Sequence, residues 1–144
     1  CRRMGVELKL QPIVWKTNVT ELNKGNIDCV WNGMTINDER KEAMNMSESY
    51  MNNRQIVVTL KDSGITNLSD LSGKSVILQA GSTAVGALDS RPDIKSLIKG
   101  GKGTEVQDNV LAMFELRKGS GDAVVMDEIV ARYYIAHLNE LPTK

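Results

Sequence analysis

The chain has 144 residues, of which 41% are hydrophobic, 25% charged and only 4% aromatic, and its formal net charge is +0. These values are typical of a soluble globular protein with one domain or two small lobes. Because the chain has neither a basic surplus nor many aromatic residues, no nucleic-acid or anionic-membrane partner is expected. No apolar run approaches the roughly 20 residues of a membrane span.

The two cysteines do not indicate a site. Cys1 stands where a lipid-modified chain would begin, but the residues up to Gly5 are typical of a helix end rather than of a flexible tether. Any export signal or lipid anchor is therefore expected outside this chain. Cys29 lies in a predicted buried strand and is interpreted as a small core residue, and the spacing gives no support for a Cys1–Cys29 disulfide.

The first part of the chain predicts strands separated by short helices. Apolar residues alternate over 6–14, which indicates a half-buried strand, and a short helix is expected over 19–24. Residues 28–31 predict a short buried strand, after which Asn37 or Asp38 caps another helix.

A change in composition divides the chain. The β-branched segment 55–60 predicts a strand, and the polar run 61–64 that follows marks a boundary. We therefore expect a partial first lobe over 1–60 and a second lobe over 61–140, with a hinge near 58–63.

Short apolar strands alternate with helices in the second part. One predicted helix is amphipathic, with an apolar face formed by Val110, Leu111, Phe114 and Leu116. The alternation predicts an α/β fold with a largely parallel sheet. Strands are expected at 75–79, 105–106 and 122–126, and helices are expected to start at Ala84, Pro92, Asp108 and Glu128, the last one ending at Leu138.

The first candidate site follows the strand predicted at 28–31. Gly33 allows backbone amides to face outward, and Arg40 lies in the first turn of the next helix. Open α/β sheets bind ligands beyond the carboxyl ends of their strands, and an Arg fork beside free N–H groups suits a carboxylate. A single helical Arg is more often a solvated surface residue, so both interpretations stay open.

Two further candidate sites follow later strands. Gly81-Ser82-Thr83 lies between a strand and a helix, where exposed amides favour an anion, although a Ser/Thr cap is often purely structural. Asp127 ends a strand and either caps the next helix or holds an ammonium group. A cation with amides and a separate carboxylate together match the backbone of a free α-amino acid.

No pattern indicates catalysis or a metal. His137 is the only histidine, and the sequence contains no HExxH, GxSxG or Cys/His metal spacing. We predict no catalytic residue, no metal site and no cofactor.

Four segments, in this order, resemble the polar-amino-acid family of extracytoplasmic solute-binding proteins of ABC transporters, family 3. They are the runs 32–40 (NGMTINDER), 71–76 (LSGKSV), 81–83 (GST) and 122–128 (DAVVMDE). The resemblance implies a two-lobed periplasmic-binding-protein fold of type II that closes on its ligand. It also implies no enzyme activity, an ABC permease as partner, and a location in the periplasm or on the outer face of a bacterial cell membrane.

The resemblance implies roles for the candidate residues. Arg40 would bind the α-carboxylate of an L-amino acid with help from Thr83, and Asp127 would bind the α-amino group. The implied ligand-binding residues are Asn32, Gly33, Thr35, Arg40, Ser82, Thr83 and Asp127.

The chain departs from the family pattern at its ends. A strand that the family places between 6–14 and 28–31 is missing, so we expect an incomplete first lobe and a fragment truncated at both ends. Unpaired strand edges are prone to association. We therefore expect this chain to self-associate or swap segments and to bind amino acids weakly by itself, and a lipid outside the chain could anchor the parent protein.

Three alternatives share the expected fold class. A receptor domain of a signalling protein would use the same ligand site within a longer chain. A periplasmic dehydratase would need an acid or base in the pocket, for which Asp127 is the only candidate. An α/β domain without any ligand is the third alternative, and the sequence does not identify which amino acid would bind.

Overall fold

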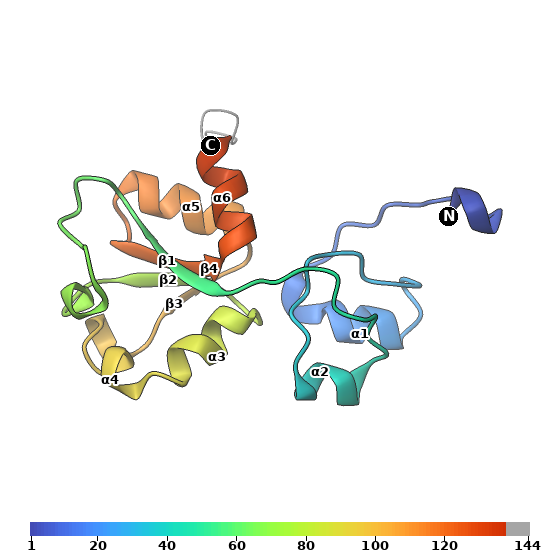
Figure 1. The fold of residues 1–144 in the computed structure, drawn as a ribbon, viewed down its shortest axis with the longest axis horizontal. Coiled ribbons are helices and arrows are strands. Elements are labelled where there is room, and N and C mark those ends of the chain that lie inside the picture. Colours follow the sequence, from blue (N-terminus) through green and yellow to red (C-terminus); the bar gives the residue numbers. More distant parts are fainter. Residues whose placement is uncertain (138–144) are drawn as a thin grey trace.

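The computed structural model describes residues 1–137, which form two parts of different character (Figure 1). The chain from Gln55 onward builds a four-stranded sheet with helices on both sides. The preceding residues form short helices joined by extended chain, and no strand is found among residues 1–54.

The sheet consists of β1 (Gln55–Thr59), β2 (Val76–Gln79), β3 (Thr104–Val106) and β4 (Ala123–Asp127), in the order β1-β4-β2-β3. Strand β2 pairs in parallel with both β3 and β4, whereas β1 is antiparallel to β4. The prediction of an α/β fold with a largely parallel sheet is confirmed.

Helices cover both faces of this sheet, as Figure 1 shows. On one face lie α3 (Thr83–Asp89) and α4 (Pro92–Lys95), and on the other lie α5 (Asn109–Lys118) and α6 (Glu128–Ala136). The other part of the molecule contains α1 (Asn18–Asn23) and α2 (Asp38–Ala43). Short 3-10 turns are found at Arg2–Met4, Trp15–Thr17, Leu68–Leu71 and Lys99–Gly101.

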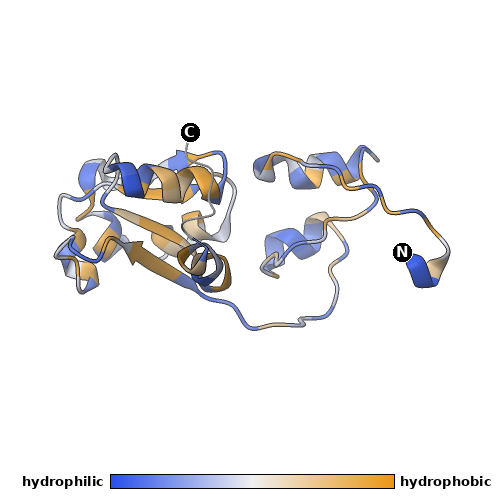
Figure 2. Ribbon diagram, turned by 90° about the horizontal axis from the view of Figure 1, so that it is seen from above, coloured by the Kyte–Doolittle hydropathy of each residue, from blue (hydrophilic) through white to orange (hydrophobic). Residues whose placement is uncertain are grey.

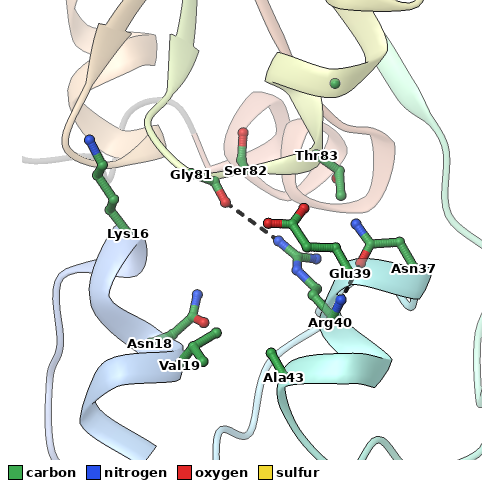
Figure 3. Close-up of a pocket in the computed structure, with 11 residues that line it drawn as sticks. Lys16, Asn18, Val19, Asn37, Glu39, Arg40, Ala43, Gly81, Ser82 and Thr83 are labelled. Carbon is green, nitrogen blue, oxygen red and sulfur yellow. Dashed lines mark hydrogen bonds between the residues drawn. The ribbon is translucent and has the colours of Figure 1, made fainter.

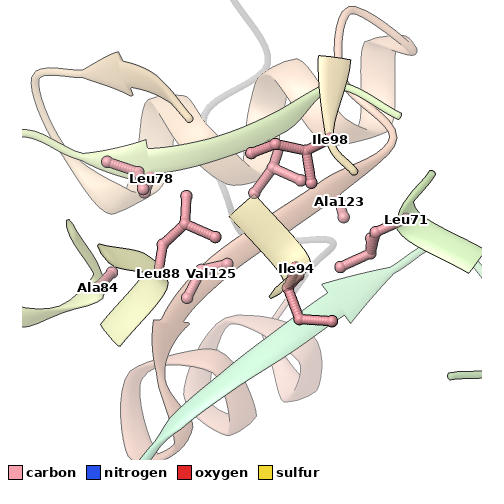
Figure 4. Close-up of a cluster of buried hydrophobic side chains, with 9 residues drawn as sticks. Leu71, Leu78, Ala84, Leu88, Ile94, Ile98, Ala123 and Val125 are labelled. Carbon is pink, nitrogen blue, oxygen red and sulfur yellow. The ribbon is translucent and has the colours of Figure 1, made fainter. Parts of the chain in front are cut away.

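The central strands send alternate side chains into two separate cores. Val76 and Leu78 pack in the cluster beneath α3 and α4 (Figure 4), whereas Ile77 between them packs in the cluster beneath α5. Strand β4 alternates in the same way. Strands buried on both faces are expected to be apolar along their whole length, and they are among the most hydrophobic segments in Figure 2.

Side-chain caps start the helices where the sequence predicted. Asn37 Oδ1 accepts a hydrogen bond of 2.9 Å from the backbone N–H of Arg40, and Asp108 Oδ1 accepts one of 2.8 Å from Leu111 N. Gly119 ends α5 with a φ of 80°, a conformation that favours glycine.

The predicted apolar face of α5 is only partly correct. The buried residues are Ala112, Met113 and Leu116, whereas Leu111 is exposed. Residues 112, 113 and 116 lie on one side of a helix with 3.6 residues per turn, and that side rests on the sheet. The expected end of α6 at Leu138 lies outside the described residues.

The strands expected at 6–14 and 28–31 are not formed, and those predictions were wrong. Both segments are extended, but a strand requires a hydrogen-bonded neighbour, and residues 1–137 provide none for them. Cys29 is therefore exposed rather than buried, and Trp31 is 91% exposed. Neither described cysteine forms a disulfide.

Strand β1 is part of the sheet of the second part of the molecule. We expected residues 55–60 in the first lobe, but β1 pairs with β4 along its length, from Gln55 opposite Asp127 to Thr59 opposite Ala123. An isolated apolar strand is stable only when it joins a sheet, and here the sheet of the second part is the available one. The division into lobes with a hinge at 58–63 remains a proposal, since the chain already joins this sheet at Gln55 and the expected lobe end at 140 lies outside the described residues.

Candidate ligand-binding site

A cavity of about 190 Å³ lies beyond the carboxyl ends of β2 and β4. It is bounded on its other side by the extended chain that leads into α2. The structure brings together all the residues that we had assigned to ligand binding, although their roles remain a prediction. These lining residues are Asn32, Gly33, Thr35, Arg40, Ser82, Thr83 and Asp127.

Arg40 is held inside this site rather than on the surface. Its residue is only 9% exposed, and its Nη1 donates a hydrogen bond of 2.8 Å to the backbone oxygen of Thr35. Its Nη2 lies 3.5 Å from the backbone oxygen of Gly81, in the turn before α3 (Figure 3). The guanidinium carbon also lies 5.9 Å from the centre of the Trp15 ring, within the range of a cation–π contact.

The charge of Arg40 is influenced by its surroundings in opposite directions. Burial lowers the pKa of the guanidinium below its ordinary value, whereas the negative charges of Asp127 and Glu39 raise the pKa. Arginine stays protonated in proteins, so the site contains a permanent, partly desolvated cation.

Asp127 ends β4, but its carboxylate does not cap α6. Its Oδ1 instead accepts hydrogen bonds from Gln55 Nε2 at 2.6 Å and from Asn53 Nδ2. Within the part of the chain that the structure describes, Asp127 forms no ion pair with Arg40, although each lines the same cavity. The site therefore presents two opposite charges that do not neutralise each other directly.

The start of α3 connects the two parts of the molecule. Thr83 Oγ1 accepts a hydrogen bond of 3.0 Å from Gln55 Nε2 and donates one of 3.4 Å to Thr35 Oγ1. The Ser82 hydroxyl donates to the backbone oxygen of Gln79 at 2.7 Å, so this side chain stabilises the turn itself. Thr83, the first residue of α3, is thus the residue here whose side chain bonds to the first part of the molecule.

The segment before α2 is supported by the loop that follows α2. The Tyr50 hydroxyl donates a hydrogen bond of 2.8 Å to the backbone oxygen of Asn32. The Met51 sulfur lies 3.9 Å from the position that a Cβ on Gly33 would occupy. The Tyr50 bond holds Asn32 at the cavity without any strand at 28–31, and Met51 lies near Gly33.

A second cavity, of about 430 Å³, shares Arg40, Ser82 and Thr83 with the first, and Figure 3 shows the residues that line it. It lies between α1, α2 and the turn before α3, and Lys16 borders it. A Cβ on Gly81 would stand 3.0 Å from the Lys16 Cα, so the backbones of the two parts lie close together at this glycine.

Sequence analysis missed several residues that line the smaller cavity. Gln79 is the last residue of β2, and Asp108 and Asn109 follow β3, so the rule that ligands lie at strand ends could have identified them. Trp15 and Tyr134 also line the cavity, but no local pattern in the sequence indicates their position.

Residues 1–137 contain neither a cluster of metal ligands nor a helix that could span a membrane. No three His, Cys, Asp or Glu side chains lie together in an arrangement suited to a metal ion. None of the described helices has the length and hydrophobicity needed to cross a bilayer.

Comparisons with known proteins give a consistent result. Residues 1–133 match the model of the bacterial extracellular solute-binding proteins, family 3. The arginine-binding extracellular protein ArtP of Bacillus subtilis is 29% identical over 141 residues, which are 97% of this chain and 53% of that protein. The glutamine-binding protein of Geobacillus stearothermophilus is 31% identical, covering 84% of this chain and 44% of the relative. The chain thus spans about half the length of the curated relatives it matches.

Solved structures show the same likeness. A histidine-bound substrate-binding protein of an ABC uptake transporter from Streptococcus pneumoniae is 35% identical, with a TM-score of 0.90 over 96% of this chain and 56% of that chain. The arginine-binding protein from T. maritima in its holo form is 33% identical, with a TM-score of 0.82 over 96% of this chain and 59% of that chain. The fold is that of the type II periplasmic binding proteins, and the chain belongs to the bacterial extracellular solute-binding proteins of family 3.

Proposed function

We propose that this protein captures a free L-amino acid outside the cytoplasm and delivers it to the permease of an ABC transporter, without catalysis. The observation that carries the proposal is the pair of charges in the smaller cavity. Arg40 and Asp127 line one cavity from different parts of the molecule and do not pair with each other. A zwitterion placed between them would satisfy both, with its carboxylate at Arg40 and its ammonium at Asp127.

The expected affinity follows from the number of such contacts. A hydrogen bond to a charged group contributes roughly 1.5–3 kcal/mol. Micromolar affinity corresponds to about 8 kcal/mol, so a few such bonds with some apolar burial are sufficient. Thr83 and the backbone near Thr35 stand next to Arg40 and would assist with the carboxylate.

The named relatives support an amino acid as the ligand. Their names specify arginine, glutamine, histidine or cystine, and all belong to the class of binding proteins rather than to enzymes or receptors. The transport role is therefore preferred over a sensing role on the same fold. The family description also supports an extracytoplasmic location in bacteria.

A thermal-shift screen of the twenty amino acids against the full-length protein tests the proposal. A ligand present at 100 times its Kd should stabilise the folded state by about 2.7 kcal/mol, which is easily detected. Arg40→Ala and Asp127→Ala should each remove the shift while the protein remains folded by circular dichroism. Wild-type protein that responds to no amino acid would contradict the proposal.

The exposed segments of the first part suggest an additional property of this chain when isolated. Leu8 and Leu10 are 62% and 81% exposed in an extended segment without a strand partner. We propose that this segment pairs with a second copy or exchanges with it, because unpaired extended chain is a template for strand addition. Light scattering should detect dimers or larger species, and a monomer with residues 6–58 ordered by NMR would argue against this.

A further inference from the structure

The smaller cavity also reaches the carboxyl end of β3, where Gln79, Asp108, Asn109 and Tyr134 line it. The strand order β1-β4-β2-β3 puts β3 two strands away from β4. At the usual spacing of strands, two steps along a sheet span about 10 Å. Asp127 ends β4 and Asp108 follows β3, so the two carboxylates are separated along the cavity. An amino acid whose backbone binds at Asp127 can extend its side chain to Asp108.

The charges that line this cavity do not balance. Among the described lining residues Arg40 is basic, whereas Asp108 and Asp127 are acidic. Lys16 borders the adjoining cavity instead, with its backbone packed against Gly81. The α-carboxylate and the α-ammonium of an amino acid would pair with Arg40 and Asp127, respectively. The carboxylate of Asp108 would then have no partner in the ligand backbone.

Asp108 has capacity to bind a further group. Its Oδ1 accepts a hydrogen bond from Leu111 N as the cap of α5, and it forms no ion pair with the residues that the structure describes. An ionised carboxylate has two oxygens and about four acceptor positions. One backbone bond therefore leaves most of this capacity available.

The surroundings of Asp108 are polar and ordered. Asn109 Nδ2 donates to Gln79 Oε1 at 3.1 Å, so the two amides hold each other in position. Burial raises the pKa of the Tyr134 hydroxyl above its ordinary value, and the negative charge of Asp108 raises it further. The phenol thus remains protonated near the carboxylate and can donate or accept a hydrogen bond.

From this geometry we infer that the ligand is a basic amino acid, whose positively charged side chain lies against Asp108 at the β3 end of the cavity. The inference rests on the proposed function, since it takes Arg40 and Asp127 as the binding site of the ligand backbone. Asp108 then acts as the residue that selects for charge.

L-arginine and L-citrulline provide the test, because they have nearly the same shape and differ in the charge of the side chain. Calorimetry on the full-length protein should show that arginine binds at least about tenfold more tightly than citrulline, a ratio that corresponds to about 1.4 kcal/mol. Asp108→Asn should reduce this ratio to about threefold or less. Because Asn caps helices as well as Asp does, the variant should keep α5 intact.

The control is Asp62→Asn, which removes the same charge from an exposed turn at the far end of β1 and should leave the ratio unchanged. Equal binding of arginine and citrulline by the wild type would overturn the inference and leave the proposed function standing. An unchanged preference in Asp108→Asn would overturn the assignment to Asp108. Failure of every amino acid to bind would overturn the proposed function itself.

Discussion

Gln55 and Asp127 stand directly opposite each other in the antiparallel β1–β4 ladder, and Gln55 Nε2 donates a hydrogen bond of 2.6 Å to Asp127 Oδ1. The same amide nitrogen lies 3.0 Å from Thr83 Oγ1, so Gln55 connects the end of β4 with the start of α3. The Asp127 carboxylate is thus engaged by side-chain amides and forms no hydrogen bond that caps α6. Gln55 is therefore a positioning residue for the proposed ammonium site.

Replacing Gln55 by Leu should weaken amino-acid binding about tenfold, the effect of losing one hydrogen bond to a charged group. The loss should disappear when Asp127 is already changed to Asn, because both substitutions affect the same interaction. A calorimetric double-mutant cycle measures this coupling. Gln11→Leu, in the exposed segment before α1, serves as the control, and additive effects in the cycle would contradict the positioning role.

Arg40→Lys should lower the affinity for an amino acid by about 30-fold or more. A lysine keeps the charge but lacks the planar fork with which Arg40 can bond Thr35 through one nitrogen and bind a carboxylate through two parallel N–H groups. Truncating one member of a buried charge pair costs about 2–5 kcal/mol. Calorimetry with the best ligand of the thermal-shift screen provides the measurement. Arg91→Lys, whose side chain forms a surface pair with Asp93, is the matched control. A folded Arg40→Lys protein with wild-type affinity would show that the guanidinium does not bind the ligand.

Gly81→Ala should destabilise the protein more than Gly64→Ala does. Both glycines have a φ near 70°, where any other residue costs roughly 1–2 kcal/mol, but only at Gly81 would the new Cβ meet the backbone of Lys16. At Gly64 no atom lies within 4 Å of the new Cβ. Urea unfolding of the two variants separates crowding from backbone strain, and equal losses would mean that the contact with Lys16 yields easily.

Acid should reduce stability partly through Glu128. Hydrogen bonds from Arg54 and Arg132 lower the pKa of this carboxyl from 4.5 to about 2. A carboxyl with a lowered pKa in the folded state stabilises the protein above the pKa of the unfolded state, and this contribution is lost as the pH falls from about 4.5 to about 2. The melting temperature of wild-type protein should therefore fall more steeply over this interval than that of Glu128→Gln. Parallel curves would show that the two surface arginines contribute little, as exposed ion pairs often do.

Local sequence patterns were sufficient to predict most helices and strands of the second part of the molecule. The strand over 75–79, the Asp108 cap and the glycine at 119 depend on neighbouring residues alone, and each was found where it was expected. The residues predicted for ligand binding line one cavity, although their roles stay a prediction. Asp127 ends β4 and Thr83 starts α3, whereas Asn32 and Gly33 follow an expected strand that is not formed. Four short segments of sequence sufficed to predict the family.

Tertiary structure alone decided where strands pair. The segments 6–14 and 28–31 have strand-like patterns but form no strand, because a pattern provides an apolar face and not the hydrogen-bonded neighbour that a strand requires. For the same reason β1 joined the sheet of the second part, which placed Gln55 opposite Asp127. The approach of Asp108 to a cavity shared with Arg40 likewise depends on the order of strands in the sheet, which local sequence patterns do not encode.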